Sequence, residues 1–293
     1  MSADAGAAGT LYLVATPIGN LQDITLRALQ ILKQCDRIAC EDTRHSRKLL
    51  THYEIHKPLL SYHTHNAHRQ LAPLLERLRA GEQIALVTDA GMPMVCDPGA
   101  ELVKACRASG IPVVVIPGAS ALTTALAAVG EPGSRFVFEG FLPATGTERR
   151  ARLAALGREE RTVVLFEAPH RVIETLAALL ALGLPEREIS ICRELTKVHE
   201  QIWQGSLREA VEYFNQNAPR GEFTLVLSGA APTERTLEPD QLRSALQLLL
   251  AEGHTRSEAS RQLAEQTGLA RRSIYQLSLG LSPVEDIEPD VGG

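Results

Sequence analysis

Apolar residues follow two different spacings along the chain. Over residues 11–129, short β-branched runs alternate with longer segments whose apolar residues recur at helical spacing. This alternation is typical of an α/β domain with a largely parallel sheet. The runs predict strands at residues 11–15, 37–40, 84–87 and 113–116, and the helical spacing predicts helices at 24–33, 67–79, 99–109 and 121–129.

A second series of strands begins after the turn-forming sequence Gly130-Glu131-Pro132-Gly133. We expect a domain boundary there and a smaller α+β or α/β domain beyond it. Its strands are predicted at residues 136–139, 162–167, 189–193, 201–204 and 223–228, with one clear helix at 171–182.

The pattern after Gly229 is helical only, over residues 238–281. Residues 259–279 resemble a helix-turn-helix, with a turn at Gly268 and a second helix that opens with Arg271 and Arg272. The predicted organisation is a disordered N-terminus at 1–9, α/β domains at 10–131 and 132–232, a helical HTH-like module at 236–281, and an acidic tail at 282–293.

Composition narrows the class of protein. Its 293 residues predict about two domains, and 44% hydrophobic with 22% charged residues is ordinary globular composition. Five Cys without a CxxC pair indicate neither a disulfide framework nor a zinc ribbon. No signal peptide or membrane-spanning run is found, so we expect a cytoplasmic protein.

Charge is distributed unevenly along the chain. The net charge of -5 argues against coating nucleic acid by bulk charge. Residues 37–79, however, hold eight Lys and Arg against four Asp and Glu, and six of the nine His lie between His45 and His68. With Tyr53 and Tyr62, this basic window suits RNA phosphates and bases. A metal at His63, His65 and His68 is not expected, because thiolate or carboxylate partners at familiar spacing are missing.

The loops after the predicted strands hold the candidate chemistry, because α/β sheets place ligand sites at the carboxyl ends of their strands. The segment from Thr88 to Gly99 combines two carboxylates with small residues that let backbone amides approach a ligand. Asp97 alone is better explained as a helix cap, but the whole loop favours a site. Residues 117–121 open a helix whose free amides can hold an anionic or carbonyl group.

Two other strand ends are open to two interpretations. The polar run Glu41-Asp42-Thr43-Arg44 suits substrate positioning or proton transfer, or is a solvated ion-pair cluster. Residues 16–20 form a ligand loop at a strand end or a helix-entry turn. They match neither a GxGxxG motif nor a P-loop, so neither dinucleotide binding nor NTP hydrolysis is indicated. Charged loops at 166–171, 193–200 and 220–222 favour a second domain that forms one wall of the same cleft.

Taken together, these loops closely resemble those of a known family. The segments ATPIGN, CEDTR, SYHTHN, TDAGMPMVCDPG, IPGASA, FEGFLP, FEAPHR, RELTK followed by HE, and GEFTLVL resemble the tetrapyrrole-methylase-like fold, and within it the branch that methylates small-subunit ribosomal RNA. The resemblance spans residues 11–280. It implies S-adenosyl-L-methionine in a cleft between two α/β domains, a homodimer, and 2′-O-methylation of a decoding-centre cytidine of 16S rRNA in the small ribosomal subunit.

The resemblance also implies roles for individual residues. Met92 and Cys96 depart from the family pattern, which affects only side-chain contacts there. The implied donor site comprises Asp89, Ala90, Gly91, Asp97, Ser120, Ala121, Phe141, Leu142, Ala168, Leu195, Glu222, Phe223 and Thr224. Glu41, Arg44, Lys197, Arg271 and Arg272 are expected to contact the RNA.

A ribose hydroxyl is a poor nucleophile at neutral pH, so a base or a hydrogen-bond acceptor would help the reaction. The candidates are Asp42, His63, Glu200 and Glu222, with Asp42 and His63 favoured because their loops lie in the basic window. On the same fold, a corrin or sirohaem-precursor methylase and a diphthine synthase remain alternatives, as does a catalytically silent RNA-binding factor. The helical module is expected to contact RNA, or else to serve as a dimerisation or lid element. Neither a membrane nor DNA is expected as a partner.

Overall fold

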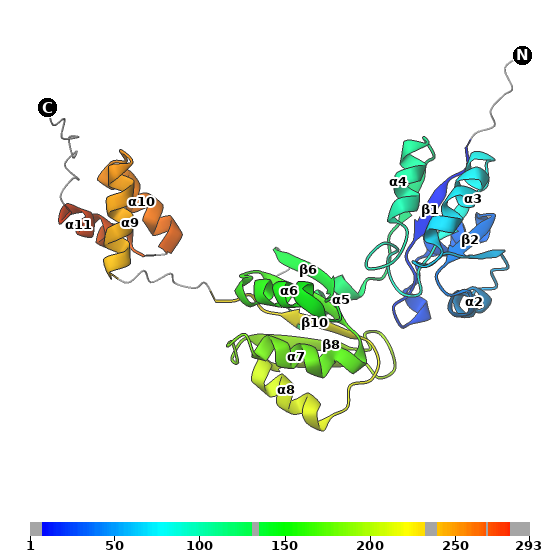
Figure 1. Ribbon diagram of the computed structural model, residues 1–293. Coiled ribbons are helices and arrows are strands. Elements are labelled where there is room, and N and C mark those ends of the chain that lie inside the picture. Colours follow the sequence, from blue (N-terminus) through cyan, green and yellow to red (C-terminus); the bar gives the residue numbers. More distant parts are fainter. Residues whose placement is uncertain (1–7, 131–134, 232–238, 268, 282–293) are drawn as a thin grey trace, which may run out of the picture. The chain divides into compact units, whose positions relative to one another are not determined.

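The computed structural model describes residues 8–130, 135–231, 239–267 and 269–281 (Figure 1). The chain splits into two compact units, one ending at Ala230 and one beginning at Ala231. The predicted boundary at residues 131–133, the turn at Gly268, the tail at 282–293 and most of the expected N-terminal segment lie outside the described residues. No described helix is long and apolar enough to cross a membrane.

The first unit contains two sheets, and we call the parts that carry them the first-sheet half (8–130) and the second-sheet half (135–230). In the first-sheet half all the strand pairs are parallel, in the order β3-β2-β4-β1-β5, which confirms the predicted parallel sheet. Its strands are β1 (Leu11–Val14), β2 (Arg37–Cys40), β3 (Leu59–Ser61), β4 (Ile84–Leu86) and β5 (Val113–Ile116).

Helices cover both faces of this sheet, so alternate residues of each strand are buried on opposite sides. Leu11 and Leu13 pack with α3 and α4, whereas Val14 packs with α1 and α2. These helices are α1 (Leu26–Gln34), α2 (Thr43–His52), α3 (Ala67–Arg79) and α4 (Ala100–Ala108). Because every strand runs the same way, every carboxyl end lies at one edge of the sheet.

The second-sheet half has a mixed sheet in the order β6-β7-β10-β8-β9. Only β6 and β7 pair in parallel; the remaining pairs are antiparallel. The strands are β6 (Phe136–Phe141), β7 (Thr162–Glu167), β8 (Glu188–Arg193), β9 (Gln201–Ser206) and β10 (Phe223–Leu227). The single parallel pair requires a crossover connection, which α6 (Gly146–Arg158) provides.

Helix α5 (Ala121–Val129) belongs to the first-sheet half by sequence but packs on the second sheet. Ala125 and Leu126 are buried in one cluster with Val164 of β7 and Val226 of β10. The opposite face of the sheet is covered by α6, α7 (Val172–Leu180) and α8 (Leu207–Gln216). The second sheet is therefore closed on one side by a helix that follows the first sheet directly.

Three helices and one strand were not predicted, namely α2, α6, α8 and β3. Helix α6 is polar and shows almost no helical period. Helix α2 is amphipathic but polar on average, and its only leucines are Leu49 and Leu50. Strand β3 has only three residues. A signal for α8 was present, since Ser206 and Glu209 form a capping box that the pattern S-x-x-E indicates.

The second unit is helical wherever the structure describes it. It comprises α9 (Pro239–Ala251), α10 (Arg256–Thr267) and α11 (Arg271–Leu279), as the sequence predicts. Leu246 of α9, Leu263 of α10 and Ile274 of α11 form its core. The backbone N–H of Thr255 donates to Glu258 Oε2 at 2.9 Å, which fixes the start of α10.

One buried arginine joins three elements of the second-sheet half. Arg187 is 9% exposed, and its guanidinium donates to the backbone oxygens of Ser228, Leu156 and Glu159 at 2.6, 2.7 and 3.1 Å. Burial lowers the pKa of this group. Arg187 thereby attaches the end of α6 to the segments that flank β8 and β10.

Replacing Arg187 with Leu should lower the free energy of unfolding by about 3 kcal/mol, because roughly 1 kcal/mol is lost for each hydrogen bond. Urea unfolding followed by circular dichroism measures the change. The matched control is Arg208→Leu, since Arg208 forms only an exposed ion pair with Glu186 at 3.0 Å. Equal unfolding midpoints for the two variants would show that the buried network adds no stability.

Candidate functional site

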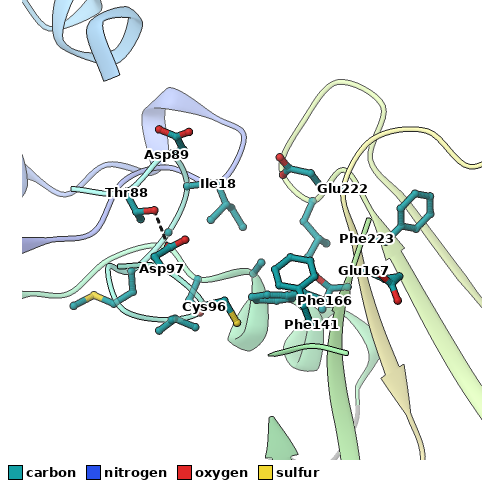
Figure 2. Close-up of a pocket in the computed structure, with 18 of the residues that line it drawn as sticks. Ile18, Thr88, Asp89, Cys96, Asp97, Phe141, Phe166, Glu167, Glu222 and Phe223 are labelled. Carbon is teal, nitrogen blue, oxygen red and sulfur yellow. Dashed lines mark hydrogen bonds between the residues drawn. The ribbon is translucent and has the colours of Figure 1, made fainter. Parts of the chain in front are cut away.

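A pocket of about 350 Å³ is lined by loops of both halves of the first unit (Figure 2). This volume lies within the range of small-molecule sites. Its walls combine small residues such as Gly91 and Ala168 with the aromatic rings of Phe141 and Phe166. The pocket therefore has an apolar surface that can enclose a flat or flexible organic molecule.

The first-sheet half contributes the carboxyl ends of its parallel strands. The loop after β1 and the loop after β4 are held together by Thr16 and Gly91, whose backbones exchange hydrogen bonds at 2.9 and 3.1 Å. The hydroxyl of Thr16 also donates to the backbone oxygen of Thr88 at 3.0 Å. These bonds fix the small-residue wall of the pocket.

The second-sheet half contributes one end of three neighbouring strands. Phe223 pairs with Glu167 and with Arg193, and the next residue, Thr224, pairs with Phe166 and Cys192. Because β10 runs antiparallel to β7 and β8, its beginning meets their ends. The strand register therefore brings together parts of three motifs that are far apart in the sequence.

Three carboxylates lie on the first-sheet side of the pocket: Glu41 after β2, and Asp89 and Asp97 after β4. Thr88 Oγ1 donates to Asp97 Oδ2 at 2.6 Å (Figure 2). Burial raises the pKa of Glu41 and of Asp97, and the neighbouring carboxylates raise both further. No described lining residue is Lys, Arg or His, so the electrostatics favour a cationic ligand.

The backbone is strained on both sides of the pocket. Positive φ angles occur at Met94 and Cys96 in one loop and at Glu194 and Thr196 in another. Among described residues other than glycine, only Glu54 shares this conformation. Such strain costs on the order of 1–3 kcal/mol for each residue and persists only where surrounding contacts impose it. Its concentration in these two loops indicates that their shape serves a ligand site.

Gly19 allows the loop after β1 to contact the strained loop after β8. A Cβ atom at Gly19 would stand 2.4 Å from Lys197 Cγ, 2.6 Å from Thr196 Oγ1 and 2.7 Å from the backbone oxygen of Leu195. All three distances are below any normal contact. The two halves of the first unit therefore approach each other here through a position that only glycine can occupy.

The loop after β8 is also held by an ion-pair network. Lys197 Nζ lies 2.8 Å from Glu194 Oε1 and 3.0 Å from Glu222 Oε2. Burial opposes the charge on Lys197, but its bonds to the two carboxylates keep its pKa above the ordinary value. Glu200 Oε2 accepts from the backbone N–H of Thr196 at 2.6 Å. These contacts fix the loop and position Glu222 at the pocket.

A buried and a partly buried arginine fix the chain where it leaves β6. Arg171 donates to the backbone oxygens of Leu142 and Pro143 at 2.8 and 3.0 Å, and Arg149 donates to Pro143 at 3.1 Å. Leu142 is 2% exposed and packs in the core. Phe141 is 48% exposed and lines the pocket. The network thus presents one of two adjacent predicted residues to a ligand and buries the other.

The structure brings together most of the residues implied for the donor site. Leu142 does not line the pocket. The lining includes Asp89, Ala90, Gly91, Asp97, Ser120, Ala121, Phe141, Ala168, Leu195, Glu222, Phe223 and Thr224, together with Glu41. Eight further lining residues belong to the candidate loops at 16–20, 88–99 and 166–171 but were not named as donor-site residues, namely Ile18, Thr88, Met92, Val95, Cys96, Phe166, Glu167 and Pro169. Cys192 lies outside every candidate loop.

Of the four candidate bases, Glu222 lines the pocket, whereas Asp42, His63 and Glu200 do not. Asp42 caps α2, accepting from the backbone N–H of Arg44 at 2.8 Å and pairing with its guanidinium at 2.9 Å. These hydrogen bonds lower the pKa of Asp42 to about 2. His63 lies just beyond Tyr62, whose N–H bonds to the backbone oxygen of Cys40 at 2.8 Å. His63 and Glu41 therefore begin neighbouring loops at the same sheet edge.

The predicted RNA contacts lie in different places. Arg44 is 87% exposed next to Asp42, and Lys197 is engaged in its ion-pair network. Arg271 and Arg272 are exposed in the second unit, where Arg271 donates to Ser257 Oγ at 2.8 Å. No group of metal-ligating side chains is found among the described residues.

Two α/β halves that share one pocket at their strand ends define a class of ligand-binding enzyme, the tetrapyrrole methylase type. The model of the Tetrapyrrole (Corrin/Porphyrin) Methylases matches residues 10–211, and the chain belongs to this family. Among its relatives, a protein of Synechocystis sp. named ribosomal RNA small subunit methyltransferase I is 53% identical, with 93% of this chain and 98% of that protein covered. A protein of Bacillus subtilis with the same name is 42% identical, covering 91% and 93%.

Solved structures share the fold. A diphthine synthase matches with a TM-score of 0.60 at 15% identity, covering 75% of this chain and 90% of that one. Uroporphyrin-III C-methyltransferase from Thermus thermophilus, solved with S-adenyl homocysteine, matches with a TM-score of 0.55 at 22% identity and covers 75% and 97%. These likenesses confirm the predicted fold class.

Replacing Gly19 with Ala should loosen the loop at residues 194–200, because the added methyl group displaces Leu195 and Thr196. Hydrogen exchange measured by mass spectrometry should show faster exchange in that loop, by about tenfold, which equals ~1.4 kcal/mol of lost protection. The matched control is Asn20→Ala, whose side chain accepts only from the N–H of Gln22. Unchanged exchange in the Gly19 variant would contradict the contact.

Proposed function

We propose that this protein transfers a methyl group from S-adenosyl-L-methionine to ribosomal RNA of the small subunit, at the 2′-hydroxyl of a decoding-centre cytidine. The observation that carries the proposal is the strained, carboxylate-lined pocket at the shared strand ends. The two relatives described above support the RNA substrate through their name, ribosomal RNA small subunit methyltransferase I. Their similarity extends over nine-tenths of this chain, so a corrin methylase or diphthine synthase is a weaker interpretation.

The residues of the pocket fit the proposed donor. Phe141 and Phe166 offer apolar surface for an adenine ring, and the small residues Gly91 and Ala121 leave room beside it. The backbone N–H of Ala121 lies in the first turn of α5, where a helix leaves its amides free. Glu41, Asp89 and Asp97 suit the positive charge of a sulfonium and an amino group. The donor would supply an electrophilic methyl group, and the protein would have to align the ribose oxygen with it and exclude water.

The structure separates the candidates for proton transfer. Asp42 has a pKa of about 2 and both of its oxygens are engaged with Arg44. It is therefore a weak proton acceptor at neutral pH and is better suited to position α2. Glu200 holds the backbone of Thr196. Glu222 lines the pocket, but its Oε2 is paired with Lys197 at 3.0 Å. His63 is therefore the favoured base, since it lies at the sheet edge where Glu41 enters the pocket. Its Nδ1 is buried without a hydrogen-bond partner among the described residues, so the proton would be accepted at Nε2.

The RNA would approach along the loops that follow β2 and β3, because these belong to the basic window at residues 37–79. Arg44 is exposed there and can contact a phosphate. Arg271 and Arg272 supply a second positively charged surface in the helical unit. A homodimer and a cytoplasmic location remain predictions that accompany this function.

Binding of the donor should weaken as the pH falls. The raised pKa values of Glu41 and Asp97 mean that these carboxylates take up protons at higher pH than ordinary ones, and each protonation removes a negative charge that faces the sulfonium. Calorimetry between neutral pH and about pH 5 should show about tenfold weaker binding of S-adenosyl-L-methionine.

S-adenosylhomocysteine is the matched control ligand, because it lacks the sulfonium charge and should lose less affinity over the same pH range. The Asp97→Asn variant should bind the donor more weakly at neutral pH and show a smaller pH dependence. Equal pH dependence for both ligands would contradict the electrostatic role, and no binding of either ligand by the unaltered protein would refute the proposed function.

Single-turnover methyl transfer to unmethylated small subunits distinguishes the candidate bases. Asp42→Asn should keep the rate within about threefold, because Asn caps a helix equally well. His63→Gln should lower the rate by about a hundredfold, the usual contribution of a general base. A large loss in the Asp42 variant with none in the His63 variant would reverse the assignment.

A further inference from the structure

A second pocket lies in the second-sheet half and differs in character from the first. It has a volume of about 360 Å³ and is formed where β8, β9 and the end of α8 meet the segment before β10. Its lining comprises Arg193, Gln201, Tyr213, Phe214, Gln216, Asn217, Ala218, Pro219 and Arg220. No Asp or Glu is among these described lining residues, so two arginine side chains determine its charge.

Both arginines retain donors for a ligand. Arg193 Nε donates to the backbone oxygen of Arg220 at 2.6 Å, which leaves its two terminal nitrogens. The Arg220 guanidinium makes no hydrogen bond or ion pair with any residue that the structure describes. Because a guanidinium fork matches the geometry of a phosphate, this pair suits a phosphate group.

The rest of the lining is suited to more than a bare phosphate. Gln201 Nε2 donates to the Tyr213 hydroxyl at 2.8 Å, and Asn217 Nδ2 donates to the backbone oxygen of Tyr213 at 2.9 Å. The amide oxygens of Gln201 and Asn217 therefore remain as acceptors beside the Tyr213 ring. Acceptors of this kind match the amino groups of nucleobases, and an aromatic ring offers a surface for a base.

Neighbouring residues of the chain line the two pockets. Cys192 lines the first pocket and the next residue, Arg193, lines the second. Likewise Arg220 is followed closely by Glu222, which lines the first pocket. A strand places successive side chains on opposite faces, so the two pockets open on either side of the end of β8.

We propose that the second pocket binds a nucleotide of the RNA substrate near the methylated position, with its phosphate on Arg193 and Arg220 and its base beside Tyr213. This inference rests on the proposed function for the identity of the RNA. The bound nucleotide contacts the same two loops that position Leu195 and Glu222 in the first pocket.

The test uses Arg220→Glu in the full chain, because the Arg220 side chain has no structural partner among the described residues. Arg193 is left unaltered, since it supports the backbone of residue 220. Fluorescence anisotropy with a short labelled single-stranded RNA should show at least tenfold weaker binding. The slope of the logarithm of affinity against the logarithm of salt concentration should fall by about 1, the value for one lost phosphate contact. Arg220→Lys should restore part of the affinity. The control is Arg150→Glu on α6, an exposed arginine without a described partner.

A second readout separates this inference from the proposed function. With small subunits as substrate, Arg220→Glu should raise KM while leaving kcat and donor affinity unchanged.

The inference would be overturned if Arg220→Glu, Arg150→Glu and the unaltered protein bound RNA with equal affinity. Weaker binding to subunits with unchanged binding to RNA would also overturn it, in favour of a ribosomal protein contact. If Arg220→Glu lost affinity for a mononucleotide but kept its affinity for RNA, the pocket would be a small-molecule site and the inference would be overturned. Absence of methyl transfer by the unaltered protein would refute the proposed function. The anisotropy measurement would still show whether the second pocket binds RNA.

Discussion

The packing of α5 on the second sheet is the contact on which the rest of the first unit depends. Ala125 and Leu126 are buried against Val164 and Val226, so the second sheet has no solvent-facing apolar side at this point. Since α5 begins at Ser120 and Ala121, which line the pocket, its docking also sets the distance between the two sets of strand ends. The core contact and the ligand site are therefore consequences of one helix position.

The pocket shows where stability is given up for function. Four residues adopt positive φ angles in its loops, and carboxylates are held close together at raised pKa values. Both features are unfavourable in themselves, and a cationic ligand would offset the repulsion between the carboxylates. The ion pairs of Lys197 and the close approach at Gly19 supply the compensating contacts. The strain is thus maintained by groups just outside the lining.

Sequence patterns predicted the parts of this protein that are set by local chemistry. The parallel strands, α3 and α5 follow from periodicity, and the motifs after β4 and β5 located much of the pocket. Cys192 was missed because it lines the pocket only through the register of β8 and β10, which no local pattern encodes. Asp42 is the opposite case, because the sequence favoured it as a base and the structure argues against that role. Its hydrogen bonds with Arg44 lower its pKa, and only the structure shows these bonds.

The net charge of -5 conceals two pockets of opposite sign. One is lined by carboxylates and by no described basic residue, and the other by two arginines and by no described acidic residue. They are separated by little more than the width of the end of β8, because Cys192 and Arg193 are consecutive. At this distance the carboxylates disfavour phosphate in the first pocket and the arginines disfavour a cation in the second. The charges therefore suit a cationic ligand in the first pocket and an anionic ligand in the second, and the alternation of side chains along the strand keeps the two sets of charges apart.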